Sequence, residues 1–132
     1  MPMFQMRATT EYPVLFLSDP GIREVVPSDT SAAFVTATDS CICFWVLSYV
    51  DGVSTVIVTD ADCDRAGRKQ FSGSVATPSG VVSVSDSGSF RYINVPATIG
   101  RTQVELWSDH DRHPEWIWIK LNEIRSVQVL SS

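Results

Sequence analysis

Residues 101–121 constrain the fold of this chain more than any other segment, because two alternating runs flank one polar segment there. In the first run Val104 and Leu106 point to one side and the polar residues between them to the other, which is the two-residue period of a strand with one wet face. The second run, residues 116–121, begins by alternating tryptophan with isoleucine and offers apolar side chains on both faces. With the polar residues 108–114 between them, the two runs predict a β-hairpin.

The rest of the chain repeats this kind of pattern. Val, Ile, Thr, Ser and aromatic residues recur in short runs between turn residues, and segments with a helical period are nearly absent. Runs spaced by roughly 8–12 residues are typical of a β-sandwich. We therefore predict an all-β fold, an antiparallel two-layer β-sandwich formed by residues 1–132 as one domain. The further strands are expected at residues 12–18, 32–38, 40–50, 53–59, 71–77, 81–85, 90–95 and 124–130.

A second hairpin is predicted within residues 40–59. Residues 41–49 are apolar on both faces, which favours a central strand that is covered on both sides. Asp51 and Gly52 follow as a two-residue turn signal of the hairpin type. We expect the strands 40–50 and 53–59 to pair with each other across this turn.

The charge of the chain limits its partners. With 15 Asp and Glu against 10 Lys and Arg, the formal net charge is −5. Binding to DNA or RNA is not expected, because phosphate neutralisation needs clustered cations. A basic protein is the natural complement of such a surface. The alternative is an acidic surface that only keeps the protein in solution.

The three cysteines indicate the compartment. Cys41 and Cys43 share one face of a strand, too far apart to bridge comfortably, and Cys63 leaves an odd number. We expect reduced, buried thiols and a cytoplasmic location. The start of the chain shows no secretory signal, and the longest apolar run, residues 41–47, is too short to cross a membrane.

One polar loop resembles part of a metal site. Asp60, Asp62 and Asp64 have the carboxylate spacing of the first half of a calcium loop. Arg65 stands where the turn glycine belongs, and Phe71 where the bidentate glutamate belongs. The pattern therefore favours a solvated acidic loop over a calcium site.

The two histidines lie in a second polar loop. His110 and His113 are accompanied by Asp109, Asp111 and Glu115, a combination that can bind zinc or perform acid–base catalysis. No third partner completes either kind of site, and no nucleophile motif or phosphate-binding loop occurs. We expect a polar loop that serves as a contact surface, with no metal, no cofactor and no enzymatic activity.

The tryptophans leave two interpretations open. Trp116 and Trp118 share a face, so they fill a core or form a platform for a ligand. Burial is favoured for Trp118, whereas Trp116 lies closer to the loop and fits either interpretation. A sugar-binding domain that uses Trp107, Trp116 and the loop 110–113 is the alternative function, and an oligomer-forming structural module is a third.

Two segments of the second half carry a resemblance to a known family. They read F-S-G-S-V-A-T-P-S-G-V-V-S-V-S at residues 71–85 and R-Y-I-N-V-P-A-T-I-G-R-T-Q-V-E-L-W at residues 91–107. This layout resembles that of bacterial competence nuclease inhibitors and related immunity-type small β-sandwich proteins. The resemblance implies an inhibitor that occupies the basic substrate cleft of a nuclease.

These observations predict a small acidic cytoplasmic protein that binds a basic toxin or nuclease and has no chemistry of its own. Charged loops accelerate encounter, and an aromatic anchor supplies affinity. Homo-oligomer formation stays open, and neither a nucleic acid nor a membrane is an expected partner. The candidate partner-binding residues are Asp60, Asp62, Asp64, Asp109, Asp111, Glu115 and Trp116.

Overall fold

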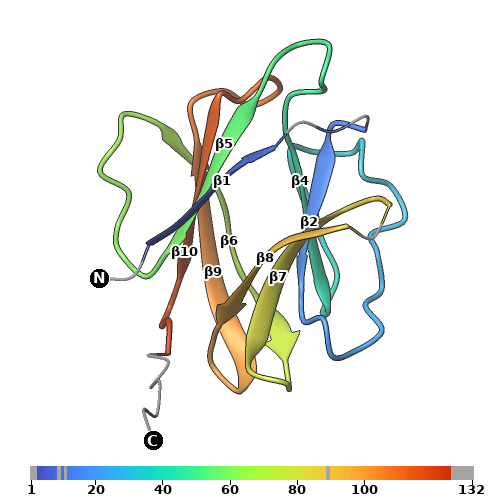
Figure 1. Ribbon diagram of the computed structural model, residues 1–132, viewed down its shortest axis with the longest axis vertical. Helices are drawn as coiled ribbons and strands as arrows, with labels where there is room; N and C mark the ends of the chain where they lie inside the picture. Colours follow the sequence, from blue (N-terminus) through green and yellow to red (C-terminus); the bar gives the residue numbers. More distant parts are fainter. Residues whose placement is uncertain (1–2, 9, 11, 89, 126–132) are drawn as a thin grey trace, which may run out of the picture.

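The computed structural model describes residues 3–8, 10, 12–88 and 90–125, and these form two five-stranded sheets (Figure 1). The first sheet has the order β1 (Met3–Ala8), β5 (Ser54–Thr59), β10 (Trp116–Leu121), β9 (Gly100–Ser108) and β6 (Arg68–Thr77). The second has the order β3 (Val35–Ala37), β4 (Cys41–Trp45), β2 (Val14–Ser18), β7 (Val81–Asp86) and β8 (Arg91–Pro96). Within the described ranges no helix occurs, so none is long and apolar enough to span a membrane.

The predicted hairpin of residues 101–121 is confirmed. β9 and β10 pair antiparallel, from Ile117 opposite Ser108 to Leu121 opposite Val104. β7 and β8, which correspond to the strands expected at residues 81–85 and 90–95, also pair antiparallel. In the described part of the chain every pair of neighbouring strands is antiparallel except β5 and β10, which are parallel. Parallel strands need a long connection between them. The segment from β6 to β9 provides it, because it lies between β5 and β10 in sequence.

The predicted pairing of residues 40–50 with residues 53–59 is wrong. β4 lies in the second sheet, between β3 and β2, and β5 lies in the first sheet, between β1 and β10. After β4 the chain crosses between the sheets, and the N–H of Val46 donates to the carbonyl of Pro13 at 2.9 Å. Gly52 does adopt a turn conformation, with φ of 138°, but this turn belongs to the crossover. The central position of β4 is nevertheless confirmed, since its residues Cys41 to Phe44 are all buried.

Other differences concern the ends of the chain and of the strands. β1 was not expected, because the sequence pattern gives little signal before residue 12. β6 begins at Arg68, inside a segment that we expected to be a loop. Ile124 and Arg125 are not in a strand, and the rest of the strand expected at residues 124–130 lies outside the described residues.

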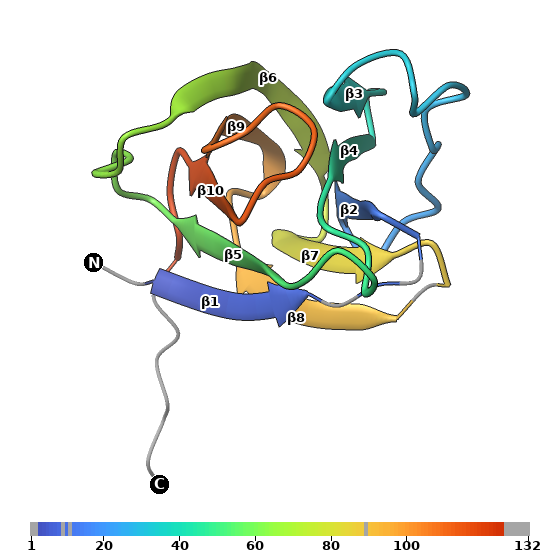
Figure 2. The ribbon, with the colours of Figure 1, turned by 90° about the horizontal axis from the view of Figure 1, so that it is seen from above.

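One hydrophobic cluster joins the facing sides of the two sheets. Seen from above, the sheets lie against each other with β1 beside β8 at one margin (Figure 2). At the other margin the N–H of Ala76, in β6, donates to the carbonyl of Asp39 beside β4. Burying each large side chain contributes roughly 1.5–3 kcal/mol. The fully buried members include Leu15, Leu17, Ile42, Phe44, Val56, Val58, Leu106, Ile117 and Ile119.

The predicted burial of the thiols is confirmed for Cys41 and Cys43 and is wrong for Cys63. Cys41 and Cys43 are free and buried on β4. Burial raises the pKa of Cys41 to about 12 and that of Cys43 to about 11, so both stay protonated at neutral pH. Cys63 is free and partly exposed.

Candidate functional site

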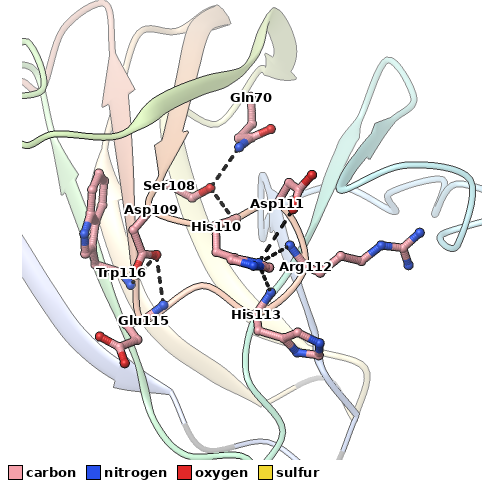
Figure 3. A network of polar contacts seen from close by, with 9 residues as sticks. All are labelled: Gln70, Ser108, Asp109, His110, Asp111, Arg112, His113, Glu115 and Trp116. Carbon is pink, nitrogen blue, oxygen red and sulfur yellow. Dashed lines mark hydrogen bonds and ion pairs between the residues drawn. The ribbon is translucent and has the colours of Figure 1, made fainter.

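The loop between β9 and β10 is closed by its first carboxylate. Oδ1 of Asp109 accepts the N–H of Glu115 at 3.0 Å and that of Trp116 at 3.3 Å (Figure 3). The hydroxyl of Ser108 donates to the carbonyl of His110 at 2.7 Å, and the amide of Gln70 on β6 donates to the same hydroxyl at 3.2 Å. The loop is therefore tied both to itself and to the neighbouring strand.

His110 shapes the tip of this loop rather than a reactive centre. Its Nδ1 accepts the N–H of Arg112 and the N–H of His113, each at 3.0 Å (Figure 3). Oδ1 of Asp111 lies 3.6 Å from the same nitrogen. The side chain of Asp111 is exposed at the tip of the loop.

An open pocket lies beside the loop. We call it the loop pocket; its volume is about 510 Å³. The guanidinium-bearing residue Arg68 contributes to its wall, together with two carboxylate-bearing residues of the loop. Among the residues that the structure describes, no group of three or more His, Cys, Asp or Glu is placed to hold a metal ion. The lining residues are Ala66, Gly67, Arg68, Gln70, Ser108, Asp109, His110 and Asp111.

The two acidic loops predicted to bind a partner, the one with Asp62 and the loop 109–115, do not form one site. Asp62 accepts a hydrogen bond from Nζ of Lys120 at 2.6 Å, and this bond holds the pKa of Asp62 below its usual value. Lys120 lies four residues beyond Trp116 on β10, which corresponds to about 13 Å along the strand. Asp62 therefore lies toward the opposite end of β10 from the loop 109–115, and its charge is paired within the chain.

The other two members of that loop have different surroundings. Asp64 is exposed. Asp60 is half-buried, and within the described residues its Oδ1 has no hydrogen-bond partner. Neither carboxylate lines the loop pocket.

A short strap, residues 60–67, covers the tryptophans of β10. The guanidinium carbon of Arg65 lies 5.7 Å from the ring centre of Trp116 and 5.9 Å from that of Trp118. The indole N–H of Trp118 donates to the carbonyl of Ala61 at 3.0 Å. Gly67 packs so closely that a Cβ there would come within 2.4 Å of the Trp116 ring. The strap therefore packs against this face of the sheet.

The predicted burial of Trp118 is confirmed, but its position differs from a core between the sheets. Trp118 is 2% exposed and is not part of the cluster that joins the sheets, whereas Ile117 and Ile119 are. Trp116 is half-buried under Arg65. One face of β10 thus packs its isoleucines into the core, and the other face packs its tryptophans against the strap.

Two tryptophans that the sugar-binding alternative would use, Trp107 and Trp116, each have a cationic side chain of this protein over the ring. Nζ of Lys69 lies 5.2 Å from the ring centre of Trp107, and Arg65 lies over Trp116. A cation over a ring occupies the face on which a sugar would stack. This arrangement favours a contact surface over a sugar platform.

The loop 109–115 is recognisable in the sequence, but its neighbours on β6 are not. Arg68 and Gln70 line the loop pocket because β6 begins earlier than expected, opposite Ser108. The signal that was available is the cation pair of residues 68–69, which typically marks an exposed edge strand.

Comparisons with known proteins point to the fold. No family model matches the sequence, and no curated protein matches it. The structure is similar to that of ComJ from Bacillus subtilis, an inhibitor of the DNA degrading activity of NucA, with 12% identity, a TM-score of 0.67, and coverage of 89% of this chain and 93% of that chain. A structure described as Crocagin biosynthetic gene J also matches, with 12% identity over 89% of this chain and 94% of that one, at a TM-score of 0.48. The resemblance to a competence nuclease inhibitor is thus confirmed at the level of the fold.

Proposed function

We propose that this chain inhibits a DNA-degrading nuclease by binding a basic surface of that enzyme in the cytoplasm. The observation that carries the proposal is the similarity to an inhibitor of such an activity over 89% of the chain. In this proposal the two sheets are the layers of one β-sandwich domain, and the loops at one end of it contact the partner. Folds host many functions, so the site residues must supply the rest of the argument.

The loop 109–115 has the charge and the rigidity that such a contact needs. A nuclease binds phosphates through lysines and arginines, so carboxylates complement its substrate groove. Asp111 and Glu115 are exposed on a loop whose backbone is held by Asp109 and His110. Fixing charged groups before binding reduces the entropy that is lost in the complex. Trp116 at the base of the loop is the aromatic neighbour of these charges.

The polar groups of the loop support binding rather than catalysis. A nucleophilic hydroxyl needs a base that accepts its proton. The hydroxyl of Ser108 instead donates to the carbonyl of His110, and Nδ1 of His110 accepts backbone N–H groups. Both side chains therefore serve the shape of the loop.

A screen of nucleases from the cell that encodes this chain tests the proposal. An extract is fractionated by cation exchange, and DNA degradation in each fraction is measured with and without excess purified protein. NucA of Bacillus subtilis is included as a defined enzyme. We expect at least one of these nucleases to be inhibited. Full activity in every fraction and in the NucA assay would contradict the proposal.

Charge variants test the loop within the proposal. Asp111→Asn combined with Glu115→Gln removes two exposed charges of the loop, and Asp39→Asn combined with Glu123→Gln removes two exposed charges elsewhere. At low salt we expect association with the inhibited nuclease to slow roughly tenfold for the loop pair and to change little for the control pair. Equal effects of the two pairs would show that only net charge matters.

A further inference from the structure

Four large apolar side chains are exposed on the crossover turn, on the segment before β2 and on the turn between β7 and β8. Tyr12 is 65% exposed, Tyr49 63%, Val50 76% and Phe90 62%. We call these four residues the aromatic rim. Exposed tyrosines and phenylalanines that gather on one surface mark binding sites more often than isolated apolar residues do.

Backbone contacts make the rim one surface. The N–H of Tyr49 donates to the carbonyl of Thr10 at 2.8 Å, and Thr10 forms a bridge with Ser48. Tyr12 lines a hollow of about 220 Å³ together with Asp86 and Gly88. The N–H of Phe90 then donates to Oδ1 of Asp86 at 3.0 Å. The rim therefore runs from the crossover turn, past the start of β2, to the turn between β7 and β8.

The rim is held by its turns. In the crossover turn the N–H groups of Asp51 and Gly52 both donate to the carbonyl of Ser48 at 3.0 Å, and the hydroxyl of Ser48 donates to Oδ2 of Asp51 at 2.9 Å. In the other turn the ring of Phe90 packs edge-on against Tyr92, with 4.9 Å between ring centres. Apolar groups that are exposed and already fixed in place bind with little loss of entropy.

The rim continues into the loop 109–115. A second hollow, of about 160 Å³, is lined by Asp51, which follows Tyr49 and Val50 in the crossover turn, and by Arg112 and His113 of the loop. The hydroxyl of Ser54 also donates to the carbonyl of Pro114 at 2.7 Å. The crossover turn, which carries Tyr49 and Val50, therefore adjoins the loop 109–115.

Negative charge concentrates around the rim. Residues 46–53, 86–90 and 109–115 contain five Asp and Glu and one Arg. Within the described part of the chain no lysine or arginine forms an ion pair with Asp51 or Asp86. By contrast, Asp39, Asp62 and Glu105 are each paired with a cation of this chain. The exposed carboxylates of Asp51, Asp111 and Glu115 are thus available to a partner, whereas those of Asp86 and Asp109 accept hydrogen bonds from their own turns.

We infer that the aromatic rim is the affinity-determining contact of this chain, and that it docks a protein surface on which arginine or lysine lies beside apolar side chains. The inference rests on the proposed function and adds the location and the chemistry of the contact. Charge complementarity selects this occupant, because a second copy of the chain would bring a surface of the same negative sign. Apolar rings surrounded by carboxylates match such a mixed surface.

Substitutions in the rim test the inference on the inhibited nuclease. Tyr49→Ser and Phe90→Ser remove exposed rings, and Ile99→Ser removes a side chain that is equally exposed, at 65%, near the opposite end of β9. We expect each rim variant to weaken inhibition at least about tenfold and the control to leave it unchanged. Inhibition that withstands both rim variants would overturn the inference and leave the proposed function in place.

A peptide titration tests the rim without any nuclease. A blocked peptide with alternating arginine and leucine is added to labelled protein, and amide shifts are followed by NMR. We expect the largest shifts at residues 49–51 and 86–88, weakened at about 0.3 M salt and absent with the matching glutamate–leucine peptide. If no nuclease is inhibited, this titration decides alone: shifts elsewhere, or none, would overturn the inference. A dimer in light scattering that Tyr49→Ser dissolves would also overturn it, in favour of a second copy.

Discussion

Asp19 offers the sharpest test of how the sheets are connected. Its side chain is fully buried just after β2, and Oδ1 accepts the N–H of Gly21 at 2.6 Å. Oδ2 accepts the N–H of Ser79 at 2.7 Å, in the turn between β6 and β7. Asp19 thus connects the end of β2, in the second sheet, to the turn between β6 and β7. Through this turn the chain passes from the first sheet to the second.

Asp19→Asn keeps the size of the side chain but replaces one acceptor by a donor. One of the two N–H groups then faces an NH₂ group and loses its partner. A hydrogen bond to a charged group contributes about 1.5–3 kcal/mol, and leaving a buried donor unsatisfied costs about 1–3 kcal/mol. These effects overlap, so we expect the free energy of unfolding to fall by about 2–4 kcal/mol.

Urea unfolding followed by tryptophan fluorescence measures this change. The matched control is Asp29→Asn, at an exposed turn where Oδ1 accepts the N–H of Ser31 at 3.1 Å. We expect the control to change the free energy of unfolding by no more than about 0.5 kcal/mol. Equal losses for the two variants would refute the reasoning, because burial of the carboxylate would then have no consequence.

Three further predictions concern the strap, its ion pair and the buried thiols. Gly67→Ala places a Cβ within 2.4 Å of the Trp116 ring, so we expect a loss of about 1–3 kcal/mol in unfolding free energy and altered tryptophan fluorescence; an unchanged spectrum would contradict this. Lys120→Met removes the hydrogen bond that lowers the pKa of Asp62, so an NMR titration of that carboxyl should show its pKa rise. The two thiols of β4 ionise near pH 9 when unfolded and only near pH 11 to 12 when buried, so the folded state binds more protons in between and stability should fall as the pH rises above about 9. Replacing both thiols by alanine should flatten that slope, and an identical slope would contradict the assignment.

Local alternation predicted the elements whose partners are close in sequence. The hairpin of β9 and β10 follows from the positions of Val104 and Leu106, because a strand with one wet face has only one register that buries them. The central place of β4 follows from its apolar residues on both faces. In both cases the information lies within about twenty residues of chain.

Pairing between distant segments was not predictable in this way. Asp51 and Gly52 form a turn, but the same signal serves a hairpin and a crossover, and the choice depends on contacts with Thr10 and Pro13. The parallel pairing of β5 with β10 likewise joins segments that are separated by four other strands. Nothing in the local sequence of β5 or β10 identifies the other strand as its partner.

The candidate surface was predictable only in part. The loop 109–115 was recognisable from its polar residues between two strands. The aromatic rim was not, because Tyr12 and Tyr49 lie at the ends of apolar runs, where a strand residue and an exposed turn residue look alike in sequence. Only the crossover and the bridge between Thr10 and Ser48 bring these side chains to one surface.

Titration of the inhibited nuclease with this protein is the most direct test of the account. DNA degradation is followed while the protein is added at low and at about 0.3 M salt. We predict that activity falls to zero at one protein per nuclease, that the complex weakens as salt rises, and that the protein alone leaves DNA intact. Undiminished degradation at every ratio, or cleavage of DNA by the protein itself, would contradict it.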